Sequence, residues 1–304
     1  MTLKSKSKLK FNFNFNVLSL FMLFSNLIHS NSFVLNNQIN TYKRIYDNKI
    51  VKVYEPNFID KSNMNALLFY SGANSLIPGD IYSNFIKALN YYNYSVIIAT
   101  NDNSVTKELL YSITNEYNCV VPITHSSGYV NCIKTIYNQE KIKKAVFLDP
   151  VDNSALVDFK LPSLSFDFGK MKIEDELTFL ENVLILNAEK SYKWKLFPKP
   201  EIPFIPNIGL NINNFKSKYP NVNVEKLSAE DYGHSDILDS LWSDLMHATI
   251  SKGNENRDQQ NLDEYHLWLA GKINNFIIEE EEIIESIKDV EVLTNETGFI
   301  KLME

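Results

Sequence analysis

The sequence predicts an α/β fold, with a mostly parallel central sheet and helices on both faces. Short apolar runs rich in β-branched residues alternate with helical segments, and this alternation builds parallel sheets with right-handed crossovers. Most runs are continuously apolar, as expected of strands covered on both faces. The expected strands are Ile50 to Tyr54, Ala66 to Ser71, Ser95 to Thr100, Cys119 to Thr124, Lys144 to Asp149, Asn182 to Asn187 and Asn221 to Lys226. The expected helices are Ile81 to Tyr91, Ser104 to Tyr117, Gly128 to Asn138 and Ser235 to Ala248.

Length, charge and cysteine content restrict the function classes. A chain of 304 residues, 44% of them apolar, is long enough for one large domain with its own core. A formal net charge of −7 offers no broad basic field for phosphates, so nucleic acid is not an expected partner. The two cysteines, Cys119 and Cys132, lack the spacing of a zinc site and are interpreted as two thiols, so no metal is expected.

The N-terminal segment, residues 1–32, has the order of a signal peptide. Four lysines precede an apolar run from Phe11 to Ile28, and small polar residues follow. The densest part of that run is shorter than the roughly twenty apolar residues of a membrane span, which favours cleavage over anchoring. Residues 33–52 are basic and acid-poor, and resemble the transit segment in the two-part presequence of algae with secondary plastids. The alternative is a loose mature N-terminus of a secreted or endomembrane-lumenal protein.

The folded domain is expected over residues 53–278. Within it, residues 153–178 and 194–219 interrupt the alternation of strands and helices. Long excursions of this kind serve as lids and substrate-binding walls. Residues 279–304 open with four consecutive glutamates and are expected to form an acidic C-terminal tail.

The strongest local motif runs from Thr124 to Gly128, T-H-S-S-G, at the end of an apolar strand and the start of a helix. In a nucleophile elbow, G-x-S-x-G, a serine on a sharp strand-to-helix turn exposes its hydroxyl group. Ser126 is therefore the candidate nucleophile. Thr124 stands at the position usually held by the first glycine, so its side chain must find room near the helix. The alternative is a serine-rich turn that caps a helix.

A serine nucleophile needs a base, and His234 is the candidate. It follows the last expected strand, where the order serine, acid, histidine of the α/β-hydrolases places the base. Ser235 or Asp236 is expected to cap the helix that follows. The other histidines are expected in the presequence (His29), facing elsewhere on the serine turn (His125), or in ordinary helical positions (His247 and His266).

The third member of a triad is an acid that holds the imidazole in its working tautomer. Asp149 ends one expected strand, and Glu189 follows the next, at the position that most members of the fold use. Asp152 is a third candidate.

An oxyanion hole needs two preorganised backbone donors. The N–H group of Ser127 would supply one. The N–H group of Ala73, in the turn Ser71 to Asn74 after an early strand, is the candidate for the other. A small turn of this kind also occurs in many unrelated loops.

With these residues assigned, the chain resembles the chlorophyllases, a branch of the α/β-hydrolases. The segment Asp231 to Asp239, D-Y-G-H-S-D-I-L-D, is similar to the family pattern D-Y-G-H-x-D-x-L-D. Leu148 to Val151 resembles I-D-P-V, whose aspartate is the family's triad acid, so the resemblance favours Asp149 over Glu189. His125 to Gly128 corresponds to H-S-R-G. The resemblance covers about Leu67 to Leu245. Departures are Thr124 for glycine, Ser127 for arginine, Tyr129 for glycine, and S-G-A-N for H-G-F.

The resemblance implies hydrolysis of the phytyl ester of chlorophyll through an acyl-enzyme, with no metal or cofactor. It also implies a small hydrophobic ester as the partner molecule and allows peripheral membrane association, while the oligomeric state stays open. One alternative is a lipase or esterase that acts on another lipid or small carboxylic ester. The other is a hydrolase-like binding protein without turnover, which the departures at Thr124 and at Ser71 to Asn74 allow.

Overall fold

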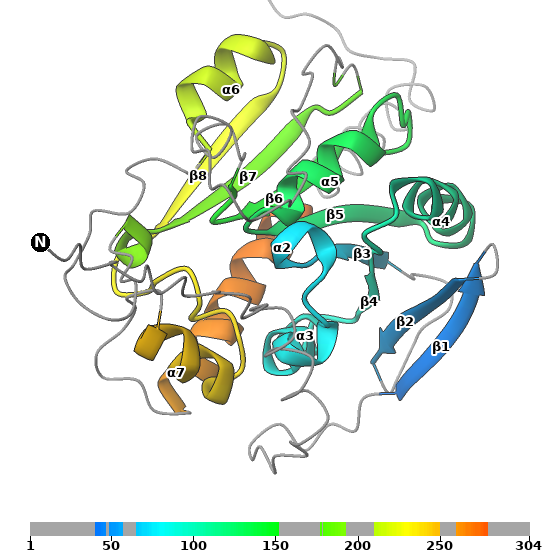
Figure 1. Cartoon of the computed structure of the whole chain (residues 1–304). Coiled ribbons are helices and arrows are strands. Elements are labelled where there is room, and N and C mark those ends of the chain that lie inside the picture. The colour runs from blue at the N-terminus through cyan, green and yellow to red at the C-terminus, as the bar shows by residue number, and fades with distance from the viewer. Residues whose placement is uncertain are drawn as a thin grey trace, which may run out of the picture. The chain divides into compact units, whose positions relative to one another are not determined.

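A computed structural model describes residues 40–46, 49–56, 65–151, 177, 179–192, 210–249 and 260–278. Eight strands form one sheet in the order β1-β2-β4-β3-β5-β6-β7-β8 (Figure 1). The strands are β1 (Asn40–Tyr46), β2 (Lys49–Glu55), β3 (Asn65–Tyr70), β4 (Tyr94–Ile98), β5 (Cys119–His125), β6 (Lys144–Leu148), β7 (Asn182–Ala188) and β8 (Asn223–Ala229). β2 runs antiparallel to both of its neighbours, and all other pairs are parallel. The predicted, mostly parallel sheet is confirmed.

Helices cover both faces of this sheet, also as predicted. They are α2 (Gly72–Ser75), η2 (Gly79–Tyr82), α3 (Ser83–Tyr91), α4 (Asn103–Glu116), α5 (Gly128–Ile136), η4 (Glu189–Tyr192), α6 (Ile212–Lys218), α7 (Ser240–Thr249) and a helix over residues 260–278. Figure 1 shows α4, α5 and α6 on one face of the sheet, with α3 and the helix 260–278 on the other. The helices on the two faces exclude water from both sides of the central strands.

Side chains on β3 show why its sequence is continuously apolar. Leu68 and Tyr70 belong to the core cluster beneath α4 and α5. Phe69 points to the opposite face, where its ring meets those of Tyr82 and Phe85 edge-on, with centroids 4.9 and 6.2 Å away. Because successive side chains on a strand point to opposite faces, a strand covered on both faces needs an apolar residue at every position.

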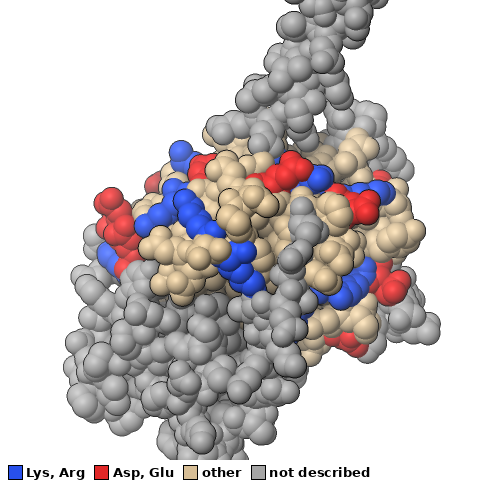
Figure 2. Space-filling view, turned by 90° about the horizontal axis from the view of Figure 1, so that it is seen from above, with Lys and Arg blue, Asp and Glu red and all other residues tan. Residues whose placement is uncertain are grey.

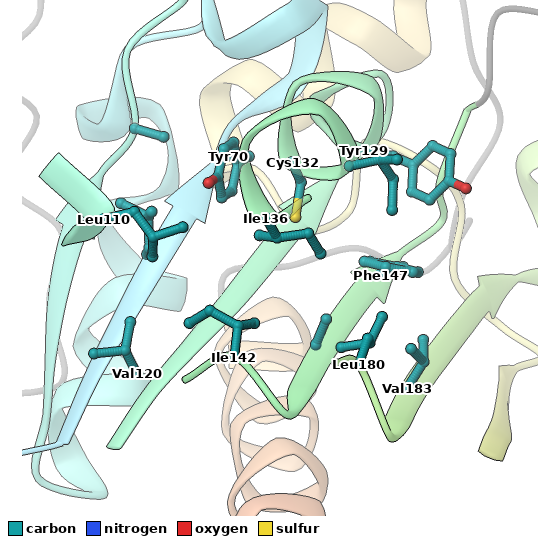
Figure 3. Close-up of a cluster of buried hydrophobic side chains, with 14 of the residues drawn as sticks. Tyr70, Leu110, Val120, Tyr129, Cys132, Ile136, Ile142, Phe147, Leu180 and Val183 are labelled. Carbon is teal, nitrogen blue, oxygen red and sulfur yellow. The ribbon is translucent and has the colours of Figure 1, made fainter. Parts of the chain in front are cut away.

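The core beneath α5 fixes the helix that begins just after Ser126. Figure 3 shows the side chains of Tyr70, Cys132, Ile136 and Phe147 packed together between that helix and the strands. The Tyr70 hydroxyl group and Thr135 Oγ1 lie 2.6 Å apart, so the polar end of this buried ring is paired. Burying a side chain such as that of Ile136 or Phe147 contributes about 1.5–3 kcal/mol to the stability of the fold. This packing holds α5 in place relative to the sheet.

The sheet begins earlier in the chain than residue 53, the expected start of the domain. β1 and β2 pair in antiparallel register, from Asn40 opposite Glu55 to Tyr46 opposite Lys49. Residues 40–46 and 49–52 are thus part of the sheet, which differs from the expectation of a loose segment over residues 33–52. The sequence did not predict β1, because its residues are largely polar and basic. A strand at the edge of a sheet needs no continuous apolar run.

The helix after His234 also begins later than expected. Residues 235–239 form turns, and α7 starts at Ser240. Of the other expectations, residues 1–32, residues 153–176 and the tail 279–304 lie outside the described residues, and only the part from 210 onward of the second excursion is described. Within the ranges given above, no helix is long and apolar enough to cross a membrane.

The cysteines and the charged surface residues reveal no disulfide and no concentrated field of one charge among the described residues. Cys119 and Cys132 form no disulfide, as predicted. Figure 2 shows basic and acidic side chains intermixed on one face of the molecule, with broad uncharged areas between them. Among the described residues of that face, the charges do not form the single-sign field that steers a polyanion.

Candidate active site

The turn between β5 and α5 places Ser126 at the carboxyl edge of the parallel strands. Ser126 has φ 55°, a left-handed conformation that non-glycine residues adopt only where the surrounding structure enforces it. Its N–H group donates to the carbonyl oxygen of Leu148 (3.1 Å), and its own carbonyl oxygen accepts from Val151 (3.1 Å). These two hydrogen bonds tie the serine turn, which follows β5, to the end of β6 and the residues just after it.

Gly128 allows this turn to lie close to β3. A Cβ atom at this position would lie 2.3 Å from the carbonyl oxygen of Tyr70 and 2.5 Å from that of Ser71. Both contacts are with backbone, which cannot move aside as a side chain can. The second glycine of the elbow motif is thus required by close approach. Thr124, at the position of the first, is completely buried and is accommodated within β5.

His234 and Asp149 form a hydrogen-bonded pair at the same edge of the sheet. The Nδ1 atom of His234 lies 2.5 Å from Oδ2 of Asp149, and their side chains are only 7% and 14% exposed. The other carboxylate oxygen, Oδ1, accepts from the N–H group of Ala188 at 3.1 Å. Asp149 itself has φ 42° just after β6, which turns its side chain toward the histidine. Two contacts thus orient the carboxylate.

Two aspartates hold the segment that carries His234, which we call the histidine loop (residues 230–239). Asp236 is fully buried. Its Oδ2 accepts from the N–H group of Gly233 (2.8 Å), and its Oδ1 accepts from the Ser243 hydroxyl group (3.0 Å) and lies 2.9 Å from His247 Nε2. The expectation that Asp236 caps the following helix is therefore wrong, because its carboxylate turns back to the backbone that precedes His234.

Asp239 ties the other end of the histidine loop to α3. Its carboxylate accepts from the N–H groups of Ser83 (3.2 Å) and Asn84 (2.9 Å), and from the hydroxyl group of Ser83 (2.5 Å). These N–H groups belong to the first turn of α3, which has no partners of its own for them. Burial raises the pKa of Asp239 to about 6, against the opposing effect of these hydrogen bonds.

The turn after β3, residues 71–75, has an unusual backbone, and we call it the β3 turn. Ala73, Asn74 and Ser75 have φ values of 50°, 55° and 64°, so three successive non-glycine residues are left-handed. Each such residue costs about 1–2 kcal/mol relative to the right-handed form. The turn is closed by a hydrogen bond from the Ser75 N–H group to the Ser71 carbonyl oxygen (2.9 Å).

Side chains from the elbow and α5 hold the β3 turn in this form. The N–H group of Asn74 donates to Ser127 Oγ (3.0 Å), and the Asn131 side-chain amide donates to the carbonyl oxygen of Asn74 (2.6 Å). Within the described part of the chain, the N–H groups of Ala73 and Ser127 have no hydrogen-bond partner. Both groups are thus available as donors beside Ser126.

Most of the residues singled out in the sequence therefore lie at one edge of the sheet. Ser126, Ser127, Asp149, His234 and the β3 turn all follow the carboxyl ends of parallel strands. Glu189, the alternative acid, opens η4 with an exposed side chain. Asp152 lies outside the described residues. Among the residues that are described, no cluster of three or more His, Cys, Asp or Glu could hold a metal ion.

Several supporting residues had no clear signal in the sequence. Asp236 and Asp239 belong to the segment Asp231 to Asp239, but a pattern of letters does not say which atoms they contact. Tyr82 and Asn131 lie far from the motifs they support. His125, expected to face elsewhere, is buried with its ring centroid 4.7 Å from that of His234.

Comparison with known proteins gives a likeness in structure but not in sequence. No protein-family model matches the chain, and no curated protein matches its sequence. Among solved structures, a sugar hydrolase from Lactococcus lactis is similar with a TM-score of 0.56 and 12% identity, over 80% of this chain and 99% of that one. A thermostable esterase from Pseudomonas putida is similar with a TM-score of 0.54 and 10% identity, over 84% and 87%.

A hyperthermophilic esterase from the archaeon Pyrobaculum calidifontis is similar with a TM-score of 0.53 and 12% identity, over 86% of this chain and 93% of that one. Identities this low bear on the fold and leave the reaction of this chain to be argued from its own residues. The sheet topology, the left-handed serine after β5 and the histidine after the last parallel strand are features expected of the α/β-hydrolase fold. Together with the structural likenesses, they show that the chain has this fold.

Proposed function

We propose that the chain is a serine carboxylic-ester hydrolase with Ser126 as nucleophile, His234 as general base and Asp149 as the acid of the triad. The observation that carries the proposal is the 2.5 Å contact between His234 Nδ1 and Asp149, at the strand edge where Ser126 follows β5 in a left-handed turn. An acid on Nδ1 directs the other ring nitrogen, Nε2, toward proton transfer with a serine.

The reaction would proceed through an acyl-enzyme. Ser126 Oγ attacks the ester carbonyl carbon as its proton passes to His234 Nε2, and the carbonyl oxygen becomes an oxyanion. The C–O bond to the alcohol then breaks, and His234 gives its proton to the departing alkoxide. Water then attacks the acyl carbon as one of its protons passes to His234, the bond between that carbon and Ser126 Oγ breaks, and His234 returns the proton to Ser126 as the carboxylic acid leaves.

The N–H groups of Ala73 and Ser127 are the proposed oxyanion donors. Preorganised backbone donors of this kind are worth most because they need no rearrangement as charge develops. The support is that the β3 turn is held in a left-handed form by Ser127 and Asn131. The cost of that backbone conformation is consistent with a functional constraint.

For the substrate we propose the phytyl ester of chlorophyll, which would give chlorophyllide and phytol. The support is the match of the segment Asp231 to Asp239 to the chlorophyllase pattern. In this chain, the Asp236 and Asp239 positions of that pattern hold the histidine loop. A small hydrophobic ester, approached by peripheral association with a membrane, belongs to the same proposal.

The proposal for location is entry into the secretory pathway through residues 1–32, with a plastid as the destination. A transit segment that ended at residue 52 would take β1 and half of β2 with it. We therefore place any second cleavage before Asn40. Sequencing of the mature N-terminus from the native host tests this, and a start after Asn40 would contradict it.

Labelling with a fluorophosphonate probe tests the reaction class. The wild-type chain should become labelled through Ser126, and Ser126→Ala should not. Ser112→Ala, which removes an exposed hydroxyl group on α4, is the matched control and should label as the wild type does. A wild-type chain that stays unlabelled while folded would support the alternative of a binding protein without turnover.

Incubation with chlorophyll a, followed by detection of chlorophyllide, tests the substrate. Release of chlorophyllide by the wild type and not by Ser126→Ala is the expected result. Hydrolysis of triacylglycerol or of short acyl esters, with chlorophyll left intact, would reject the chlorophyll proposal and favour a lipase or esterase that acts on another ester.

A further inference from the structure

A row of buried hydrogen bonds joins the β3 turn to the backbone of His234. The N–H group of Gly72 donates to the Tyr82 hydroxyl oxygen (3.0 Å). That hydroxyl group lies 2.9 Å from His125 Nδ1, and His125 Nε2 lies 2.9 Å from the carbonyl oxygen of His234. Tyr82 and His125 are 0% and 3% exposed. The row therefore runs from one element of the proposed site to another entirely within the protein.

The direction of each bond in this row is fixed by its two ends. A backbone carbonyl oxygen can only accept, so the ring proton of a neutral His125 must lie on Nε2. Burial, with a smaller effect of the nearby His234, lowers the pKa of His125 to about 3, so the ring is neutral at ordinary pH. Its Nδ1 atom is then an acceptor, and Tyr82 must donate to it. The Tyr82 oxygen in turn accepts from Gly72.

Every donor in the row has one acceptor, and a side chain at Gly72 would crowd the row. Burial raises the pKa of Tyr82, so its proton stays on the oxygen. A Cβ atom at Gly72 would lie 3.2 Å from the Tyr82 hydroxyl oxygen and 3.4 Å from His125 Nδ1. The titratable groups that bear on His125 are Tyr82, His234 and Asp149. The rings of Tyr82 and His125 also contact each other edge-on, with centroids 5.6 Å apart, so a shift of either ring would alter the position of the β3 turn relative to His234.

We propose that His125 and Tyr82 are positioning residues that hold the oxyanion donor turn at a fixed distance from the catalytic histidine. The inference rests on the proposed function of this site. Neither side chain exchanges a proton with the substrate. His125 contacts the backbone carbonyl oxygen of His234, and Tyr82 contacts the N–H group of Gly72, the residue before the proposed donor Ala73.

Tyr82→Phe tests the row with only one atom removed. The N–H group of Gly72 and His125 Nδ1 lose their partner, while the ring keeps its volume. Because the donor turn is displaced but not deleted, we expect kcat for a short acyl ester to fall about tenfold to a hundredfold, with KM little changed. Loss of a whole donor sets the upper limit of that range.

Tyr70→Phe is the matched control. Tyr70 is as deeply buried as Tyr82, and its hydroxyl group pairs with Thr135, away from the row. Tyr82→Phe should lose more thermal stability than Tyr70→Phe, because it leaves both Gly72 N–H and His125 Nδ1 without a partner, whereas Thr135 keeps its hydrogen bonds to the carbonyl oxygens of Asn131 and Cys132. Only Tyr82→Phe should lose kcat. Equal kcat values for the two variants, in an active wild-type background, would overturn the inference and leave the proposed function intact.

Two substitutions at His125 provide a second test of the inference. His125→Leu removes both hydrogen bonds of the ring and should lower kcat at least as far as Tyr82→Phe. His125→Gln can still donate to the carbonyl oxygen of His234 and should recover part of that loss. Equal kcat values for His125→Gln and His125→Leu would contradict a role for the bond to His234.

The protonation state of the His125 ring tests the row without relying on activity. Nitrogen-15 spectra of the wild-type chain should show a neutral His125 ring with its proton on Nε2, unchanged from pH 8 to pH 5. A ring protonated on Nδ1, or one that titrates in this range, would overturn the inference whether or not the chain hydrolyses esters. Absence of labelling by a fluorophosphonate would instead reject the proposed function, whereas the spectra test the hydrogen-bonded row by itself.

Discussion

Asp149 and His234 lie 85 residues apart in the chain, yet Oδ2 of the aspartate is 2.5 Å from Nδ1 of the histidine. The contact forms because β6 and β8 are parallel to β7, which lies between them, so the segments after both strands reach the same edge of the sheet. The second carboxylate oxygen accepts from the N–H group of Ala188, which orients the carboxylate toward His234.

Asp149→Asn should therefore abolish most of the activity. An amide cannot stabilise the imidazolium or hold the working tautomer, and loss of the carboxylate in such a triad lowers kcat about 10⁴-fold. Glu189→Gln, at the exposed alternative acid, should keep wild-type kcat. Initial rates on a short acyl ester measure both variants, and full activity in Asp149→Asn would disprove the assignment.

Gly128→Ala should destabilise the fold and not only the site. Its new Cβ atom would meet the carbonyl oxygens of Tyr70 and Ser71, so α5 would have to move away from β3. We expect a loss of about 3 kcal/mol in the free energy of unfolding, measured by urea titration.

Gly271→Ala is the matched control for that change. Its Cβ atom would approach the hydroxyl group at the end of the flexible Tyr92 side chain, 2.8 Å away, and the residue lies inside the helix 260–278. Because alanine favours helix over glycine by about 1 kcal/mol, this variant should be neutral or more stable. Similar losses in both variants would argue against the close approach at Gly128.

Thr124→Val should leave stability unchanged or raise it. Thr124 is fully buried, and within the described residues its hydroxyl oxygen has no hydrogen-bond partner. Replacing an unpaired buried hydroxyl group by a methyl group of similar shape removes a desolvation cost of about 1–3 kcal/mol. Thermal unfolding measures the effect. A marked fall in Tm would show that the hydroxyl group does have a partner.

His266 should make the fold sensitive to acid. Burial lowers the pKa of this histidine to about 4, below its ordinary value of 6.5. Between those two values the unfolded chain binds the extra proton more readily than the folded one, so stability falls as the pH drops from 6.5 toward 4. At about 1.4 kcal/mol per pKa unit, the loss from this group is on the order of 3 kcal/mol.

Replacing His266 by glutamine should reduce that loss. The amide can still donate to the carbonyl oxygen of Asp236, as the Nε2 atom of His266 does at 3.1 Å, but it does not titrate. Urea titrations at pH 7 and pH 4.5 should show a smaller difference for His266→Gln than for the wild type. Some sensitivity should persist, because the pKa of His125 is lowered for the same reason. An identical acid slope in both proteins would contradict the prediction.

The sequence predicted those elements that depend on neighbouring residues better than those that depend on residues far apart in the chain. Continuous apolar runs identified β3, β5, β6 and β7 nearly to the residue, because burial on both faces leaves no place for polar side chains. β1 was missed, since a strand at the sheet edge meets no such requirement. The start of α7 was placed five residues early, because residues 235–239 are held outside the helix by contacts of the Asp236 carboxylate with Gly233 and of the Asp239 carboxylate with α3.

The sequence by itself determined the α/β class, the serine turn and the set of candidate residues, because buried strands and tight turns depend on residues that are neighbours in the chain. Tertiary structure alone decided that Asp149 meets His234, that the β3 turn is left-handed, and that Tyr82 and His125 join that turn to the histidine loop. These contacts depend on strand order and register, which bring distant segments to one edge of the sheet.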